Sequence, residues 1–308
     1  MVYFGGVLKY LRQKAKSPPK SGQHSRRRGR KPRIAALKER AGALPKSEWI
    51  KIGVPGFDEL LEKGIPKSTN ILVSGGPGTG KTIFCLQTLY NAVREGHDCL
   101  YATFEEAPRR LRQHMAEFGW NVEKVEGKDA FLKLKIGKAG KSGSLVIRQL
   151  DPLQIARSVE ALLEKSAGRL SMKMEGIPEF VPAALTPHMI ALDSLSALES
   201  AFTGKPGGYR VYIEQLFRLF EKIGATTFLI TETEDAPMRY SRTGVEEFLA
   251  DGVLVLYNTK IRGLRIQAIE ILKMRGAKHE RKIAPMQITS KGISIFPSET
   301  VYGEEELK

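Results

Sequence analysis

The amino-acid sequence predicts an α/β fold with a mostly parallel central sheet, helices on both faces and an antiparallel extension at the C-terminal side. From residue 67 to residue 232, short β-branched and apolar runs alternate with longer segments of helical periodicity. This alternation is typical of consecutive strand–helix–strand units. After residue 250, three strand-like runs follow one another at short intervals. Short connections indicate antiparallel pairing, so we expect these runs to extend the same sheet.

The first half of the alternating pattern contains four elements. The run 67–75 is β-branched and apolar and predicts a strand. Apolar residues recur at helical spacing over 82–96, where Gly96 occupies a C-cap position, so a helix is predicted. The run 98–104 predicts the next strand, and 107–119 predicts a second helix that also ends on glycine.

The second half continues the alternation. Asp151 and Pro152 suit the N-cap and first position of a helix, which fixes one helix start. The predicted elements are a strand at 130–137, a helix at 151–168, a strand at 188–194, a helix at 207–224 and a strand at 226–232. The antiparallel runs are 251–258, 264–275 and 286–296.

The charge distribution predicts three regions. The net charge of the 308-residue chain is +15. Residues 1–47 carry fourteen Lys or Arg and one acid, Glu39, whereas the remaining residues carry 35 basic and 33 acidic groups. We therefore predict a basic, largely disordered arm over 1–47, with a short helix at 34–44, because few of its residues can form a core. A single domain over 48–300 and an acidic tail over 301–308 follow.

Composition excludes several classes of protein. The two cysteines, Cys85 and Cys99, have neither metal-ligand spacing nor the number needed for a disulfide framework, and the five histidines are scattered. No apolar run approaches the roughly 18 residues that span a bilayer. In residues 1–16 the charges follow the apolar stretch, the reverse of a secretory signal. We expect a cytoplasmic protein without a transmembrane segment.

A glycine-rich segment carries the strongest chemical signal. It reads GGPGTGKT from Gly75 to Thr82 and satisfies G-x-x-x-x-G-K-S/T between a predicted strand and a predicted helix. Backbone N–H groups of such a loop surround an anion, and the helix N-terminus adds a favourable dipole. We expect Lys81 to reach the β and γ phosphates and the Thr82 hydroxyl to bind Mg²⁺; this context disfavours a turn without a ligand. The residues expected to hold ATP are Gly75, Gly76, Pro77, Gly78, Thr79, Gly80, Lys81, Thr82 and Ile83.

Two predicted strands end on carboxylates. Asp193 ends the apolar strand 188–194 and is expected to hold a Mg²⁺-bound water beside Thr82. Glu105 and Glu106 follow strand 98–104, and the carboxyl ends of parallel strands share one edge. We expect one glutamate to orient and polarise the water that attacks the γ-phosphate. A solvated aspartate and a helix-capping glutamate are the alternatives, and which glutamate is the main base stays open.

Six blocks in this order resemble the KaiC-like group of RecA-superfamily ATPases, and they extend across nearly everything from Trp49 onward. The blocks are GVPGFDELLEKGIPKS (53–68), SGGPGTGKT (74–82), YATFEEAP (101–108), ALDSLSALES (191–200), TGVEEFLADGVLVL (243–256) and ILKMRGAKHERKIAPMQIT (271–289). The resemblance implies a RecA-like P-loop NTPase fold and a hexameric ring with ATP between subunits. It also implies that Glu105 and Glu106 are catalytic. The chain departs from the group by an inserted loop between Gly168 and His188.

The resemblance implies further that Lys273 and Arg275 reach a neighbouring subunit's nucleotide and that His279 borders it. Lys273 and Arg275 are two residues apart, so they share one face of a predicted strand. A pair of cations at a strand tip suits a phosphate that gains charge in the transition state. The alternative is a solvated basic edge that discourages strand aggregation. A second, autophosphorylating domain has no match in this chain.

The basic arm allows three interpretations. The segment RRRGRKPR (26–33) concentrates Arg and Lys, which favours nucleic-acid binding through residues 9–46, and RGRKP weakly resembles a minor-groove hook. A solvated tail is the second interpretation. A membrane-surface helix is the third, because apolar residues lie at helical spacing beside basic ones at Tyr3, Phe4, Val7, Leu8 and Leu11.

These features predict a regulatory or signalling ATPase that binds and hydrolyses ATP in a ring. A DNA-handling ATPase of the RecA/RadA type and a non-hydrolysing ATP sensor are the alternatives. The first would need DNA-binding loops in the nearly neutral domain, and the second has no need of the paired glutamates. The sequence leaves the regulatory protein partner and the controlled process open.

Overall fold

The computed structural model describes residues 49–138, 141–157, 181–182, 184–202, 206–233, 240–261 and 263–299. These residues belong to one compact unit that spans 47–308. The predicted arm at 1–47 with its short helix, the tail at 301–308 and most of the predicted loop between Gly168 and His188 lie outside the described residues.

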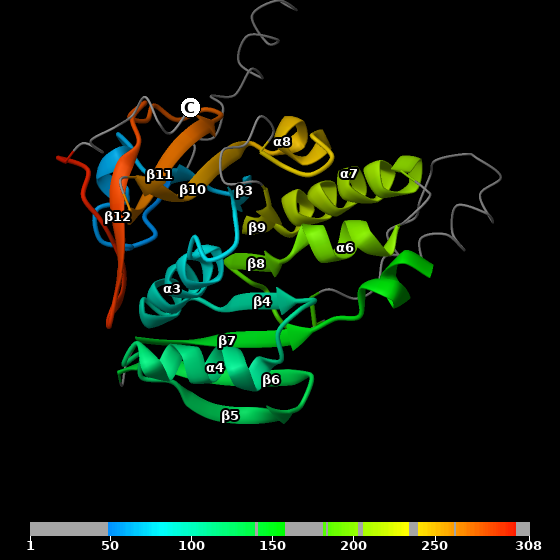
Figure 1. Cartoon of the computed structure of the whole chain (residues 1–308). Helices are drawn as coiled ribbons and strands as arrows, with labels where there is room; N and C mark the ends of the chain where they lie inside the picture. The colour runs from blue at the N-terminus through cyan, green and yellow to red at the C-terminus, as the bar shows by residue number, and fades with distance from the viewer. Residues whose placement is uncertain are drawn as a thin grey trace, which may run out of the picture. The chain divides into compact units, whose positions relative to one another are not determined.

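One sheet of eleven strands forms the centre of the unit, and its middle is parallel, as predicted (Figure 1). Six strands run parallel in the order β10, β3, β9, β8, β4, β7. Their bounds are β10 (Gly252–Ile261), β3 (Asn70–Gly75), β9 (Thr226–Glu232), β8 (Met189–Asp193), β4 (Cys99–Thr103) and β7 (Lys141–Gln149). Every residue of β3, β4 and β8 is buried, which explains their continuous apolar runs, since helices cover both faces of such strands.

Antiparallel strands extend both edges of this parallel centre. On one edge lie β11 (Leu264–Met274), β12 (Ala284–Thr289) and β13 (Gly292–Ile295), which confirms the predicted C-terminal extension. On the other edge lie β6 (Phe131–Lys138) and β5 (Glu123–Lys128), antiparallel to β7 and to each other.

Two expectations about the strands need correction, and two further strands were not predicted. The run 251–258 was expected in the antiparallel portion, but β10 pairs parallel with β3 and antiparallel only with β11. The strand at 130–137 was expected within the parallel alternation, but β6 is antiparallel. The sequence analysis missed β7 and β5. The pairing of β7 with β4 displaces β6 from the parallel centre, because β4 already has β8 on its other side.

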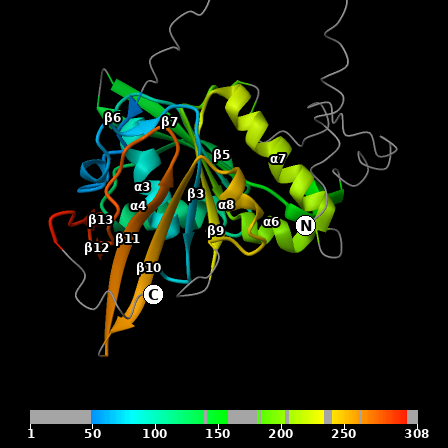
Figure 2. The ribbon, with the colours of Figure 1, turned by 90° about the horizontal axis from the view of Figure 1, so that it is seen from above.

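Helices cover the two faces of the sheet and build two apolar cores (Figure 2). On one face, α3 (Lys81–Arg94) and α4 (Pro108–Glu117) contribute Phe84, Leu89, Leu111 and Met115 to the first core. On the other face, α6 (Leu195–Ala201) and α7 (Pro206–Ile223) contribute Leu198, Tyr212, Leu216 and Phe220 to the second core. The predicted helix at 151–168 is seen as helix over 152–157, and the rest of it is not described. Within the described ranges, no helix has the length and apolar character needed to cross a membrane.

The segment before the parallel centre forms small elements that the sequence analysis did not predict. The strands β1 (Trp49–Ile50) and β2 (Ile65–Pro66) pair antiparallel around η1 (Asp58–Leu60). Gly56 adopts a φ of +79°, and the Ile295 N–H donates to the Pro55 carbonyl at 2.9 Å. A Cβ added at Gly56 would lie 2.0 Å from the Ile295 carbonyl oxygen, so this turn packs directly against β13.

We predict that Gly56→Ala lowers the free energy of unfolding by about 2–4 kcal/mol. The cost of a left-handed backbone at alanine and the cost of the clash with Ile295 add together. Gly96→Ala is the matched control: its φ is +98°, but nothing lies within 4 Å of the added Cβ. The control should lose only about 1 kcal/mol. Urea unfolding of both variants measures the difference, and equal losses would show that packing against β13 is not what requires glycine at position 56.

Candidate active site

The carboxyl ends of β3, β4, β8 and β9 meet at one edge of the sheet and surround a cavity of about 410 Å³. The strand register aligns these ends, since Thr103 pairs with Asp193 and Gly75 pairs with Glu232. The cavity is lined by Pro77, Gly78, Gly80, Lys81, Thr82, Ile83, Glu105, Glu106, His114, Asp193, Ser194, Ile230, Glu232 and Ile288. The fold therefore brings the glycine-rich loop and all three predicted carboxylates together.

The loop between β3 and α3 has the backbone geometry of an anion cradle. Gly80 is the N-cap of α3 with a φ of +94°, so the chain enters the helix through the left-handed region. Gly75 has no room for a side chain, because an added Cβ would lie 2.5 Å from the Leu256 carbonyl oxygen on β10. The Thr79 hydroxyl donates to the Gly76 carbonyl at 2.9 Å and fixes the turn. The N-terminal amides of α3 follow directly, a suitable place for a phosphate.

Lys81 is almost fully buried beneath this loop. Its ammonium donates to the carbonyl oxygens of Gly75 and Gly76, each at 2.8 Å. Burial lowers the pKa of Lys81, while the nearby carboxylates of Glu232, Asp193 and Glu105 act in the opposite direction. The ammonium therefore lies at the base of the cavity within the field of three acids, held by carbonyls that a phosphate oxygen can replace.

Asp193 and Thr82 form the hydrogen bond that links β8 to α3. The Thr82 hydroxyl donates to Asp193 Oδ2 at 2.9 Å, and the Tyr101 hydroxyl from β4 donates to the same oxygen at 2.6 Å. Burial of Asp193, which is 6 % exposed, raises the pKa of its carboxyl, and the two hydroxyl donors partly offset this rise. Two hydroxyls thus hold one carboxylate at the mouth of the phosphate loop.

The paired glutamates lie in the bend that follows β4. The N–H groups of both residues donate to the Thr103 hydroxyl, at 3.2 Å for Glu105 and 3.0 Å for Glu106. Glu105 Oε1 accepts a hydrogen bond from the Ser194 hydroxyl at 2.5 Å, which holds it beside Asp193. Glu106 Oε1 lies 3.4 Å from Arg110 Nε and 3.6 Å from His114 Nε2. The two carboxylates therefore have different partners, one in the strand-end cluster and one on α4.

Sequence reasoning missed four residues of the cavity region: Tyr101, His114, Ser194 and Glu232. The Ser194 hydroxyl caps α6 by accepting from the Ala197 N–H at 3.3 Å while donating to Glu105. Glu232 ends β9 as Asp193 ends β8, and its N–H donates to the Ser196 hydroxyl at 2.8 Å. The rule that identified Asp193, an acid at the end of an apolar strand, also fits Glu232.

Lys273, Arg275 and His279 lie outside the lining of this cavity. The Lys273 ammonium donates to the carbonyls of Glu247 at 3.1 Å and Ala250 at 2.6 Å. The Arg275 guanidinium donates to the carbonyls of Phe248 at 3.1 Å and Leu249 at 3.3 Å. Burial and the neighbouring Arg275 lower the pKa of Lys273. The backbone of His279 forms an isolated antiparallel β-bridge with Leu61.

The carbonyls that hold the two cations belong to the C-terminal part of α8 (Val245–Leu249) and to the residue that follows it. A buried carboxylate anchors this helix: Glu246 is 1 % exposed and accepts hydrogen bonds from Tyr209 on α7 at 2.6 Å and from Thr243. Phe248, the outward residue of α8, is 75 % exposed. The cations and this apolar side chain thus share one surface.

The oxygen donors at the cavity mouth fit a magnesium ion. Mg²⁺ prefers carboxylate and hydroxyl oxygens, and Thr82 and Asp193 offer both at 2.9 Å from each other. The Asp193 carboxylate is buried, and its Oδ2 receives two hydroxyl donors, so a cation would add a further compensating charge.

Comparison with known proteins adds a family relationship to this geometry. The family profile described as the KaiC ATPase matches residues 50–300. A UPF0273 protein of Aeropyrum pernix is 33 % identical over 257 residues, which cover 82 % of this chain and 95 % of that protein. A circadian clock oscillator protein KaiC of Picosynechococcus sp. is 30 % identical over 262 residues, 83 % of this chain but 46 % of that protein.

A solved structure supports the same relationship. The crystal structure of a KaiC-like protein from Pyrococcus horikoshii OT3 superposes with a TM-score of 0.61 and 30 % sequence identity. The match covers 82 % of this chain and all of that chain. The predicted RecA-like architecture is therefore confirmed by the fold and by this neighbour.

Proposed function

The chain belongs to the KaiC family of ATPases, and from that premise we propose that it binds ATP with Mg²⁺ and hydrolyses it as a ring-forming regulatory ATPase. One observation carries the proposal. Thr82, Asp193 and Glu105 come from three different elements, yet they meet at the mouth of the phosphate loop through hydrogen bonds of 2.9 Å and less. A strand end that only stabilises the fold needs no such convergence of acids beside a cavity.

The phosphate loop would hold ATP through its backbone amides and Lys81. On binding, the Lys81 ammonium would exchange the Gly75 and Gly76 carbonyls for oxygens of the β and γ phosphates. Thr82 would hold Mg²⁺ directly and Asp193 would hold one of its water ligands. When bound, Mg²⁺ supplies neutralisation of the phosphate charge.

Glu105 is the stronger candidate for the base that activates water. It lies beside Asp193, and a single neutral hydroxyl holds it there, so its second oxygen can accept a proton from water. Glu106 instead faces Arg110 and His114, an arrangement that suits support of α4 and of the cavity wall. In the reaction, water attacks the γ-phosphorus, its proton passes to Glu105, and ADP leaves with the former bridging oxygen.

A second copy of the chain would complete the site with Lys273 and Arg275. Both side chains are held on the α8 surface and neither lines this chain's cavity, which supports a role toward a neighbour's phosphates. The exposed Phe248 gives that surface an apolar contact for another subunit. The family resemblance favours a hexamer with His279 at the same interface. ATP turnover would then change the contacts between subunits and the affinity for an unidentified regulatory partner.

The basic arm gives this ATPase a candidate second partner. Its fourteen basic residues against one acidic residue favour nucleic acid, bound through residues 9–46 without strong sequence preference. A DNA-handling ATPase is less favoured, because the residues after the arm are nearly neutral in charge. A cytoplasmic location agrees with the two cysteines, which are buried free thiols.

We predict that Glu105→Gln lowers kcat for ATP hydrolysis by about 10²–10⁴-fold, because the amide cannot accept the proton. Glu106→Gln is the matched control and should lose less than about tenfold, since it removes only support by Arg110 and His114. Steady-state phosphate release measures both, and nucleotide affinity should change little. The opposite ranking would assign the base to Glu106.

We predict that Lys273→Ala and Arg275→Ala each lower turnover by at least about 100-fold while ATP affinity stays within a few-fold. Mixing Arg275→Ala subunits with Glu105→Gln subunits should restore activity, because about a quarter of the interfaces in a mixed ring regain both groups. Wild-type turnover by both alanine variants, or no recovery on mixing, would contradict action between subunits.

We predict that a chain beginning at Ser47 keeps its ATPase activity and loses nucleic-acid binding, since it lacks the fourteen basic residues of the arm. Fluorescence anisotropy with a labelled duplex at increasing salt measures the affinity of both chains. A steep salt dependence should appear only with the arm. DNA-stimulated hydrolysis that survives the truncation would favour a DNA-handling ATPase instead.

A further inference from the structure

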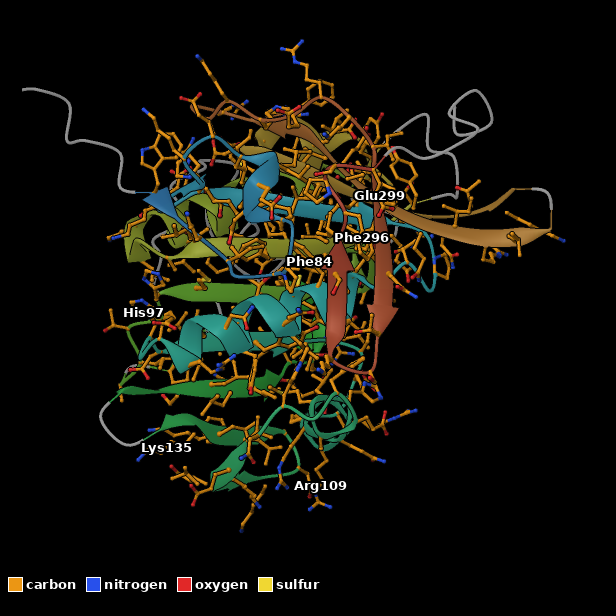
Figure 3. All side chains as sticks on the ribbon, turned by 90° about the vertical axis from the view of Figure 1, so that its left-hand side faces the viewer. Phe84, His97, Arg109, Lys135, Phe296 and Glu299 are labelled. Atoms are coloured by element: carbon orange, nitrogen blue, oxygen red, sulfur yellow. The ribbon has the colours of Figure 1, made fainter. Side chains whose placement is uncertain are left out.

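A second cavity, of about 550 Å³, lies at the amino ends of the parallel strands. Its lining includes Trp49, Lys51, Lys67, Arg94, His97 and His188. The phosphate loop precedes α3, whereas this cavity adjoins the other end of that helix, where Figure 3 labels His97. A helix of 14 residues is about 21 Å long, so the two cavities are separate sites.

Two stacked imidazoles form part of the cavity wall. The rings of His97 and His188 lie 4.0 Å apart between centroids, with 15° between their planes. The sheet fixes His188, because its N–H donates to the Asp98 carbonyl at 2.7 Å and its carbonyl accepts from the Thr226 N–H at 3.2 Å. Partial burial, His97 and Lys67 together lower the pKa of His188 to about 4. The ring is therefore neutral at pH 7 in surroundings that already repel positive charge.

Cations from three segments face this cavity. Lys51 follows β1, Lys67 lies between β2 and β3, and Arg94 ends α3. Glu95 is the one carboxylate in the lining. The nearby Asp98 carboxylate accepts the N–H and hydroxyl of Ser144, at 2.8 and 2.6 Å, and so is turned to β7. The two lysines and the arginine outnumber the one carboxylate, so the lining carries an excess of positive charge.

Aromatic faces accompany this charge. The Trp49 indole lines the cavity. The Lys63 ammonium forms a cation–π contact with this ring, 6.0 Å from its centroid. The Arg94 guanidinium, which lines the cavity, lies 5.7 Å from the centroid of the Tyr90 ring, which is outside the lining. Flat apolar faces beside cations are the combination that recognises a planar group attached to an anion.

We propose that this cavity binds a small phosphate-bearing ligand, with Lys51, Lys67 and Arg94 contacting the phosphate and Trp49 and the imidazole pair contacting any attached ring. Its volume lies within the roughly 300–1,000 Å³ typical of small-molecule sites. The charge is gathered around a hollow and not along a ridge, which favours a small ligand over a nucleic-acid backbone. The inference does not depend on ATP hydrolysis at the other cavity.

The test follows the imidazole resonances of the full chain by NMR at pH 7, with one equivalent of ADP and Mg²⁺ present to occupy the phosphate loop. Pyrophosphate, AMP and a short oligothymidylate are titrated separately, and His188→Gln assigns the His188 signals. We expect pyrophosphate or AMP to shift the His97 and His188 resonances. Tighter binding of AMP would identify a nucleotide as the ligand, and tighter binding of pyrophosphate would identify a free oligophosphate; either supports the proposal.

Charge reversal locates the binding. Lys51→Glu combined with Lys67→Glu should weaken the Kd at least about tenfold. Lys124→Glu is the matched control, because Lys124 is exposed on the edge strand β5 and lies outside the cavity lining; it should leave the Kd unchanged. If the double variant does not fold, Lys51→Gln should still weaken the Kd about threefold. Absence of shifts at about 10 mM ligand, equal shifts in the double variant, or shifts with the oligothymidylate alone would overturn the proposal.

Discussion

The hydrogen bond from Thr82 to Asp193 is the interaction on which the rest of the active edge depends. It joins the first turn of α3 to the end of β8, and β9 separates β8 from the strand that leads into α3. A buried carboxylate is costly unless donors surround it, and Tyr101 supplies the second donor from β4. One aspartate thus fixes the relative position of two strand ends and the phosphate loop. Ser194, next in the chain, then places Glu105 beside it.

The same edge distributes charge in a way that suits a triphosphate. Three carboxylates act on the single Lys81 ammonium, so acidic groups outnumber basic ones beside the phosphate loop. Mg²⁺ bound with a polyphosphate would offset this excess of negative charge. Lys273 and Arg275 lie on a different surface, where carbonyls of α8 and of the residue after it hold them. The buried Glu246 anchors α8 to α7, and that anchor would let a subunit contact made at Phe248 influence how the cations are presented.

The sequence was sufficient to predict those parts of the structure that neighbouring residues determine. The glycine-rich loop, the fully buried parallel strands and the acids at their ends were all predictable, because each has a composition that few alternatives share. The strand β7 was missed since KSGSLVIRQ mixes glycine, serine and charge with its apolar residues, and β5 was missed because EKVEGK is almost wholly exposed. The partners of β10, and the hydrogen bond that holds Glu105 beside Ser194, depend on contacts with distant segments. No local pattern encodes those contacts.

The decisive measurement is a structure of the protein with Mg²⁺ and a non-hydrolysable ATP analogue bound. We expect the triphosphate within the loop from Gly75 to Thr82, the metal on the Thr82 hydroxyl, and a water held by Asp193. We also expect Glu105 to lie within hydrogen-bond distance of a second water in line with the γ-phosphorus, with Arg275 of an adjacent subunit on the opposite side. A triphosphate bound elsewhere, or bound here with Glu105 turned away from the γ-phosphate, would show that these residues do not form the catalytic site.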